Sequence, residues 1–158
     1  MRRRLPATRI ISGIDYYGLP TDFPGHDDNP VQNADIYVRI GRLEQAFKQD
    51  INQPNFLANF IVHEYEALLF CQPEKFIDWI DDGDPVKRLL AMKAEFSTPE
   101  KINNSPQTAP SKRIRAVIPT YKKTLHGPLI AADIGLDSIR QQCPHFHSWL
   151  QCIEALAD

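Results

Sequence analysis

The sequence has few cysteines, no long apolar run and little net charge, and each shortage argues against one class of protein. Its three cysteines, Cys71, Cys143 and Cys152, form neither an even set nor a Cys-x-x-Cys pair, which argues against a disulfide scaffold and favours a reducing cytoplasm. No apolar segment approaches the ~18 residues of a membrane-spanning helix. A formal charge of −2 means that any polyanion site must be local. We expect a cytoplasmic protein with no membrane segment.

The length and the apolar content of the chain are sufficient for a folded core. A chain of 158 residues with 42% hydrophobic and 24% charged residues lies in the globular range and is long enough for one domain. We therefore expect a single domain over residues 1–158, with an α/β sheet part over 1–70 and a mainly helical part over 71–158. The sequence does not indicate an oligomeric state.

The first part has the pattern of a β-α-β unit. Residues 9–16 form a short isoleucine-rich run bounded by turn residues, which predicts a buried strand. From Asn33, apolar residues recur at helical spacing, and Asn33 or Asp35 can cap that helix. Residues 55–62 are nearly continuously apolar, as expected for a strand covered on both faces of a parallel sheet. Two parallel strands joined by a helix would end at the same edge of the sheet.

The second part is predicted to be helical. Pro73 fits a first helical position, and apolar stripes at helical spacing follow it. Their members are Phe76, Ile77 and Ile80, then Val86, Leu89 and Leu90, and finally Phe146, Trp149, Leu150, Ile153 and Leu156.

Acidic residues follow both predicted strands. Asp15 ends the first strand, and Glu64 and Glu66 come directly after the second. Ligands of parallel α/β sheets bind at the carboxyl ends of the strands, and magnesium is held by one or two carboxylates together with water and phosphate oxygens. If the strands are neighbours, Asp15, Glu64 and Glu66 could share one divalent cation. The alternative is that Glu64 caps a helix, Glu66 is solvated and Asp15 bonds to turn amides.

His63 stands beside these glutamates and has two interpretations. A neighbouring carboxylate would favour its protonated form and suit it to acid or base catalysis. The other interpretation is a hydrogen bond to a backbone carbonyl.

A basic segment lies between Glu100 and Asp133, where the sequence has no acid but six lysines and arginines. Pro110 can begin a helix there with four apolar residues on its inner face, Ile114, Val117, Ile118 and Tyr121. Lys112 and Arg115 would then be neighbours on the outer face. We expect phosphate or nucleic-acid contacts from Lys112, Arg113, Arg115 and Lys122; the alternative is a solvated basic face.

Several motifs, in order, resemble the bacterial family of domain of unknown function 4276. They are Asp15-Tyr16-Tyr17-Gly18-Leu19-Pro20, His63-Glu64-Tyr65-Glu66-Ala67-Leu68-Leu69-Phe70, Thr108-Ala109-Pro110-Ser111-Lys112-Arg113-Ile114, and a closing segment that includes Cys143-Pro144-His145-Phe146. The resemblance runs from about Ile14 to the end of the chain.

The resemblance implies a Toprim-like α/β domain of the topoisomerase and primase type, whose acidic edge binds magnesium. Members of the family often occur beside ATPases of phage-defence systems. By this resemblance, Asp15 would match the acid that ends a central strand, Glu64 or Glu66 would be a further metal or supporting acid, and Lys112 and Arg113 would contact phosphate.

Two departures from the family pattern affect this expectation. The family begins with a strand and a Val-Glu-Gly-x-Thr-Glu type motif that has no counterpart here, so we expect an incomplete parallel sheet with an open apolar edge. Tyrosine follows Asp15 where a Toprim Asp-x-Asp motif would place its second acid.

The sequence thus leads to two functional hypotheses. The first is a nuclease-like, magnesium-dependent Toprim-type protein of a bacterial defence module that processes nucleic acid, with Glu64, Glu66 and His63 as catalytic residues and manganese able to replace magnesium. The second is a non-catalytic interaction subunit of a partner ATPase, in which the acids serve only the structure. A third reading is a fragment with no fold of its own.

Overall fold

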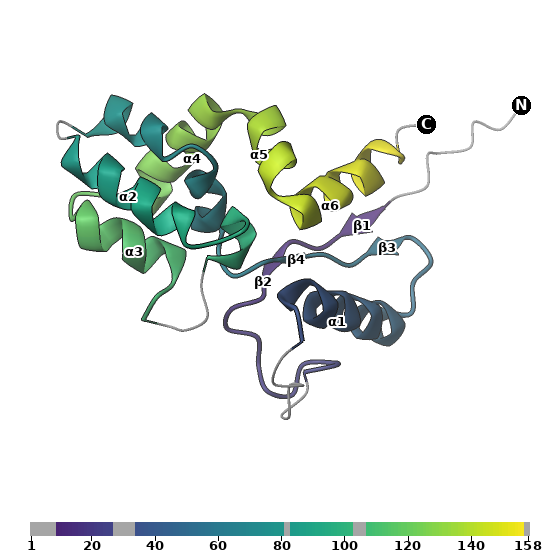
Figure 1. Cartoon of the computed structure of the whole chain (residues 1–158). Coiled ribbons are helices and arrows are strands. Elements are labelled where there is room, and N and C mark those ends of the chain that lie inside the picture. Colours follow the sequence, from purple (N-terminus) through teal and green to yellow (C-terminus); the bar gives the residue numbers. More distant parts are fainter. Residues whose placement is uncertain (1–8, 27–33, 81–82, 103–106, 157–158) are drawn as a thin grey trace, which may run out of the picture. The chain divides into compact units, whose positions relative to one another are not determined.

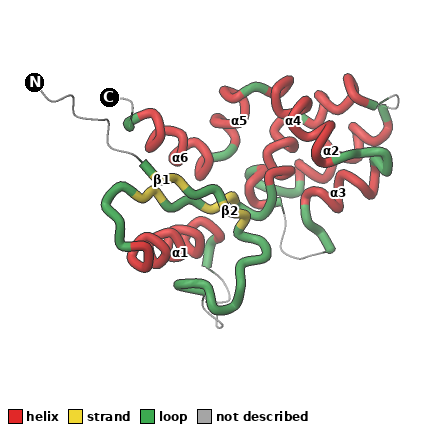
Figure 2. Tube along the Cα trace, turned by 180° about the vertical axis from the view of Figure 1, so that it is seen from behind, coloured by secondary structure: helices red, strands yellow, loops and turns green. Residues whose placement is uncertain are grey.

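The computed structural model describes residues 9–26, 34–80, 83–102 and 107–156. The chain divides into two compact units, residues 1–61 and 62–158, whereas we placed the change from sheet to helices after Phe70. The N-terminal unit is α/β, and the C-terminal unit is built from helices (Figures 1 and 2). No helix in these ranges is long and apolar enough to cross a membrane.

The N-terminal unit has the predicted parallel pairing. β1 (Ile10–Ile11) pairs with β3 (Phe56–Leu57), and β2 (Ile14–Asp15) pairs with β4 (Phe60–Ile61), both in parallel. Ser12 interrupts the ladder between the two pairs, because its Oγ accepts from Asn59 N at 2.8 Å and donates to Asn59 O at 3.2 Å. The predicted long strands are therefore two short bridges each. The ends of β2 and β4 coincide, since Asp15 is in register with Ile61.

The helix that connects the strands is α1 (Ile36–Ile51). It begins where Asp35 accepts a hydrogen bond from Tyr37 N at 2.9 Å, and it ends at Asn52 in the left-handed conformation. Asp35 is thus the cap, and Asn33 lies outside the described residues. Ile40 and Leu43 are buried, and Phe47 packs within an aromatic cluster that comprises Phe23, Phe47, Phe56 and Phe60.

One expectation for this unit is wrong. Residues 9–16 were predicted to form a buried strand, yet Ile10 is 49% exposed and Ile11 39% exposed. Among the described residues, each sheet has two strands, so one edge of β1 and one edge of β2 has no neighbouring strand there. The incomplete Toprim-like sheet expected from the family resemblance stays a prediction.

The C-terminal unit begins with two 3₁₀ helices, η1 (Tyr65–Cys71) and η2 (Pro73–Trp79), followed by α2 (Asp84–Ala94) and the short η3 (Pro99–Lys101). Four α-helices complete it: α3 (Pro110–Val117), α4 (Lys123–Ile134), α5 (Leu136–Gln142) and α6 (Pro144–Glu154). Pro73 does open a helix, as the sequence predicts. The prediction of a mainly helical second half is confirmed.

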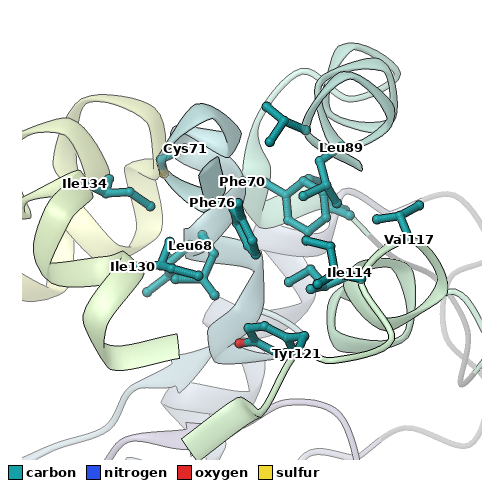
Figure 3. Packing of buried hydrophobic residues seen from close by; sticks show 14 of the residues in the cluster. Leu68, Phe70, Cys71, Phe76, Leu89, Ile114, Val117, Tyr121, Ile130 and Ile134 are labelled. Carbon is teal, nitrogen blue, oxygen red and sulfur yellow. The ribbon is translucent and has the colours of Figure 1, made fainter. Parts of the chain in front are cut away.

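One apolar core holds these helices together (Figure 3). Its centre is η1, because Leu69 and Phe70 are fully buried and contact several helices. Residues from α2, α3 and α4 close around it, among them Leu89, Ile114 and Ile130. The inner face predicted for α3 is confirmed at Ile114 and Val117, which are buried; Ile118 and Tyr121 are buried too but lie after the end of the helix.

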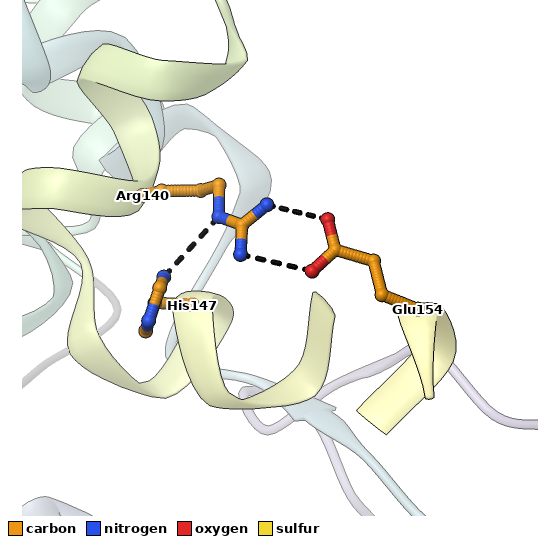
Figure 4. Close-up of polar contacts among 3 residues, drawn as sticks. All are labelled: Arg140, His147 and Glu154. Carbon is orange, nitrogen blue, oxygen red and sulfur yellow. Dashed lines mark hydrogen bonds and ion pairs between the residues drawn. The ribbon is translucent and has the colours of Figure 1, made fainter. Parts of the chain in front are cut away.

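The last two helices are joined through Arg140 (Figure 4). Its guanidinium donates to both carboxylate oxygens of Glu154, at 2.5 and 3.0 Å, and its Nε donates to His147 Nδ1 at 3.2 Å. This pairing lowers the pKa of the exposed Glu154 carboxyl. No side chain of α6 is fully buried, so the apolar stripe predicted for this helix is only half-covered.

Candidate functional site

The segment that joins the sheet to the helices carries the residues singled out from the sequence. His63 has a positive φ of 68° and is buried. The left-handed conformation is unusual for a side chain of this size. Glu64 and Glu66 follow His63, and both contact other residues of the C-terminal unit. The acid or base role of His63 stays a prediction.

Glu64 anchors the start of α3. Its Oε2 accepts a hydrogen bond from Ser111 N at 3.0 Å. The residue at the N-cap of α3 is Ala109, which has no side-chain acceptor, and Pro110 follows it. The first amide groups of a helix need an acceptor and favour a negative charge, and Glu64 supplies both. The interpretation in which Glu64 caps a helix is correct, although the helix is α3 and not its own.

Glu66 is fully buried and forms an ion pair with Lys123. Glu66 Oε2 lies 2.9 Å from Lys123 Nζ, and the Lys123 side chain is 41% exposed whereas that of Glu66 is 0% exposed. Burial raises the pKa of the Glu66 carboxyl, and the ammonium group of Lys123 opposes that rise. The interpretation in which Glu66 is solvated is therefore wrong, because the side chain faces the core.

Two tyrosines lie beside this ion pair. Tyr65 Oη donates to Gly127 O at 3.2 Å. Tyr121 is buried, and its Oη has no hydrogen-bond partner among the described residues. Gly127 packs closely against this group, since a Cβ atom at its position would lie 3.1 Å from Tyr121 Oη. Burial and the charge of Glu66 raise the pKa of both phenols, so the hydroxyl groups stay protonated.

Some of the basic residues singled out from the sequence are exposed, and others are in contact with protein groups. Lys112, Arg115 and Lys122 are exposed, which confirms the outer face predicted for α3. Arg113 is engaged: its Nε donates to Thr108 O at 2.8 Å, and its guanidinium lies 5.2 Å from the ring centre of Phe96. Lys123 pairs with Glu66. The exposed cations are therefore Lys112, Arg115 and Lys122, which we call the basic face. The phosphate contact expected of Arg113 stays a prediction.

Protein groups contact both of the glutamates that the sequence offers as metal ligands. The ammonium of Lys123 pairs with Oε2 of Glu66, and the Ser111 amide of α3 donates to Oε2 of Glu64. No group of three or more His, Cys, Asp or Glu side chains in the described ranges could hold a metal ion. Asp15 belongs to the N-terminal unit. A magnesium site shared by Asp15, Glu64 and Glu66 stays a prediction.

Sequence reasoning missed the partners of the two glutamates and a similar role for Glu100. The buried Glu100 carboxylate accepts from His145 N at 3.0 Å and from Phe146 N at 2.8 Å, at the start of α6. Both α3 and α6 begin with proline after a residue that cannot cap, Ala109 or Cys143. That pattern was a usable signal, because a helix start without its own acceptor needs one from elsewhere in the chain.

Comparison with known proteins assigns the chain to a family and to nothing narrower. The family model described as Domain of unknown function (DUF4276) matches residues 1–154. No curated protein matches the chain, and no solved structure does.

Proposed function

Since the chain belongs to the DUF4276 family, whose function is unknown, we propose that it binds nucleic acid through the basic face. The observation that carries this proposal is the exposure of Lys112, Arg115 and Lys122, in a segment with no acidic residue between Glu100 and Asp133. Phosphate contacts supply most of the affinity for nucleic acid and need exposed cations without competing carboxylates. The protein as a whole carries a charge of −2, so the attraction of a polyanion depends on local groups of cations such as this face.

Glu64 and Glu66 make contacts that hold the helices next to the basic face in place. Glu64 fixes the first turn of α3, the helix that presents Lys112 and Arg115. Glu66 neutralises Lys123, which keeps the start of α4 against η1. The binding surface is thus built on a rigid element whose position depends on acids from a distant part of the sequence.

Nuclease-like processing is the catalytic form of this proposal. It would make the protein a Toprim-type, magnesium-dependent member of a bacterial defence module in the cytoplasm. The parallel β-α-β arrangement with Asp15 at the end of β2 supports it, and the engagement of Glu64 and Glu66 by protein groups speaks against it. We therefore derive no catalytic step that involves a metal.

A second candidate function is a non-catalytic subunit that binds a partner ATPase. The observation that favours it is that Glu64 and Glu66 both make structural contacts. In this case the acids would be required for folding but not for any reaction, and the ATPase would co-purify with the protein from its native source.

The experiment is to titrate fluorescent DNA and RNA oligonucleotides with the full chain and to run parallel samples on denaturing gels with magnesium, manganese or EDTA. We expect binding that Lys112→Glu weakens and that Arg88→Glu, a matched charge reversal at an exposed position of α2, leaves unchanged. Cleavage that requires a divalent ion and is lost in Glu66→Gln would support the nuclease form. Absence of binding to every oligonucleotide at low salt would reject the proposal.

A further inference from the structure

Helix α4 is apolar on two faces, but only one of them is covered by the protein. Its inner face is buried through Gly127, Ile130 and Ile134, and Figure 3 shows both isoleucines within the core. On the outer face, Leu125 is 51% exposed and Leu129 is 37% exposed. A helix that is apolar all round is normally covered all round. The outer face of α4 therefore has the composition of an interface.

A tryptophan extends this apolar surface. Trp79 of η2 is 36% exposed, and its Nε1 donates to Asp133 Oδ2 at 2.8 Å. The indole consequently lies beside the C-terminal end of α4. Tryptophan is enriched in protein interfaces, because its large apolar ring also carries a polar group. We call the surface made by Trp79, Leu125, Leu129 and the exposed Ala132 the α4 face.

The charges that border the α4 face are self-complementary. Lys122 stands immediately before α4, Asp133 stands near its end, and both are exposed. Lys122 is the N-cap residue of α4 and Asp133 is in its last turn, so the two charges stand at opposite ends of the helix. A two-fold axis perpendicular to α4 reverses the direction of a second copy and brings opposite ends of the two helices together. Lys122 of each copy then meets Asp133 of the other.

We propose that the α4 face is the two-fold interface of a homodimer in which α4 packs antiparallel to α4 of a second copy. Leu125, Leu129 and Ala132 pack at the centre, and one Lys122–Asp133 pair lies at each end. The antiparallel helix dipoles also favour this arrangement. One twelve-residue helix is about 18 Å long, so the interface falls at the small end of specific interfaces. We accordingly expect a weak dimer that dissociates on dilution.

The test is sedimentation velocity on the full chain over about 1 to 500 μM. We expect a concentration-dependent dimer whose Kd rises at least about tenfold in Leu125→Glu. The matched control is Leu136→Glu, since Leu136 is also 51% exposed but lies on α5; it should leave the Kd unchanged. A wild-type monomer at every concentration, or equal effects of the two variants, would overturn the proposal.

A charge exchange tests the antiparallel arrangement separately. Lys122→Asp and Asp133→Lys should each weaken the dimer by placing like charges together, and the double variant should restore it. Thermal unfolding of each dilute variant shows whether the monomer is folded. Failure of the double variant to recover the dimer, with all monomers folded, would reject the antiparallel pairing. Lys122 also belongs to the basic face, so both experiments are run without nucleic acid and their outcome does not depend on the proposed function.

Discussion

At the scale of single residues, the C-terminal unit depends on glutamates that satisfy helix amides from a distance. Glu64 accepts from Ser111 N, and Glu100 accepts from two amides of α6. Each of these helices begins with proline, so its first residue has no amide hydrogen to donate. A carboxylate from another segment also adds negative charge at the positive end of the helix.

Removing the Glu64 carboxylate tests its role as an anchor. Glu64→Ala should lower the free energy of unfolding by about 1–2 kcal/mol, because the Ser111 amide loses its acceptor. Glu64→Gln keeps an acceptor oxygen and should lose less than half as much. Urea denaturation monitored by tryptophan fluorescence measures both values. Equal stability of Glu64→Ala and the wild type would contradict this role.

The buried Glu66 should give the stability a specific pH dependence. Burial raises the pKa of the Glu66 carboxyl above its ordinary value of 4.5, so the folded protein binds this proton more tightly than the unfolded chain does. The favourable contribution is complete below about pH 4.5 and is lost as the pH rises through the pKa of the folded state. We expect Glu66→Gln to gain stability relative to the wild type between about pH 5 and pH 8. Parallel pH profiles of the urea midpoint would argue against it.

The cysteines differ in reactivity. Cys71 and Cys143 are buried with their Sγ atoms 3.5 Å apart, and Cys152 is exposed. The hydrogen bond to Cys71 and burial raise the pKa of the Cys143 thiol, and a protonated thiol is a poor nucleophile. A thiol reagent should therefore label one cysteine in the native protein and three after denaturation. Rapid labelling of more than one native thiol would contradict the packing around Cys71.

At the scale of elements, the periodicity of apolar residues predicts the helices that have a local cap or a clear division into an apolar and a polar face. α1 has a cap and a regular apolar stripe, and α3 has an apolar inner face with Lys112 and Arg115 opposite, so both follow from the sequence. The parallel pairing of β2 with β4 also follows from two apolar runs joined by a helix. The division of each predicted strand into two short strands does not follow from the sequence, because it results from a hydrogen bond between the Ser12 side chain and the Asn59 backbone.

The sequence predicted which residues belong to the candidate site, but not which of them contact one another. Spacing identified Glu64, Glu66 and the basic segment, yet it does not show that Lys123 neutralises Glu66 or that Ser111 binds Glu64. These contacts join positions 47 or more residues apart, and hydrophobic periodicity carries no information on such pairs. The 3₁₀ form of η1 was also unpredicted; it follows the left-handed turn at His63.

The exposed isoleucines of β1 lead to a prediction about self-association. Ile11→Lys should change the free energy of unfolding by less than about 0.5 kcal/mol, because the side chain is exposed. It should also reduce light scattering of concentrated samples, since lysine on a sheet edge opposes edge-to-edge pairing. A variant that unfolds more easily would instead show that this isoleucine is covered in the native protein.

At the scale of the whole molecule, the proposed function requires that a local cluster of cations attracts nucleic acid, because the net charge of the chain is −2. The basic face does this if Lys112 and Arg115 contact phosphates from the outer side of α3. Each phosphate contact releases bound counterions from the nucleic acid, so the number of contacts can be read from the dependence of affinity on salt. The contribution of the two residues is therefore measurable without a structure of the complex.

The most direct measurement is the slope of log K against log salt concentration for a duplex oligonucleotide, compared between the wild type and Lys112→Ala/Arg115→Ala. We predict that the double variant loses affinity at every salt concentration and that its slope is shallower by about 2, one unit for each lost phosphate contact. An unchanged slope in a folded double variant would show that the outer side of α3 does not meet the nucleic acid.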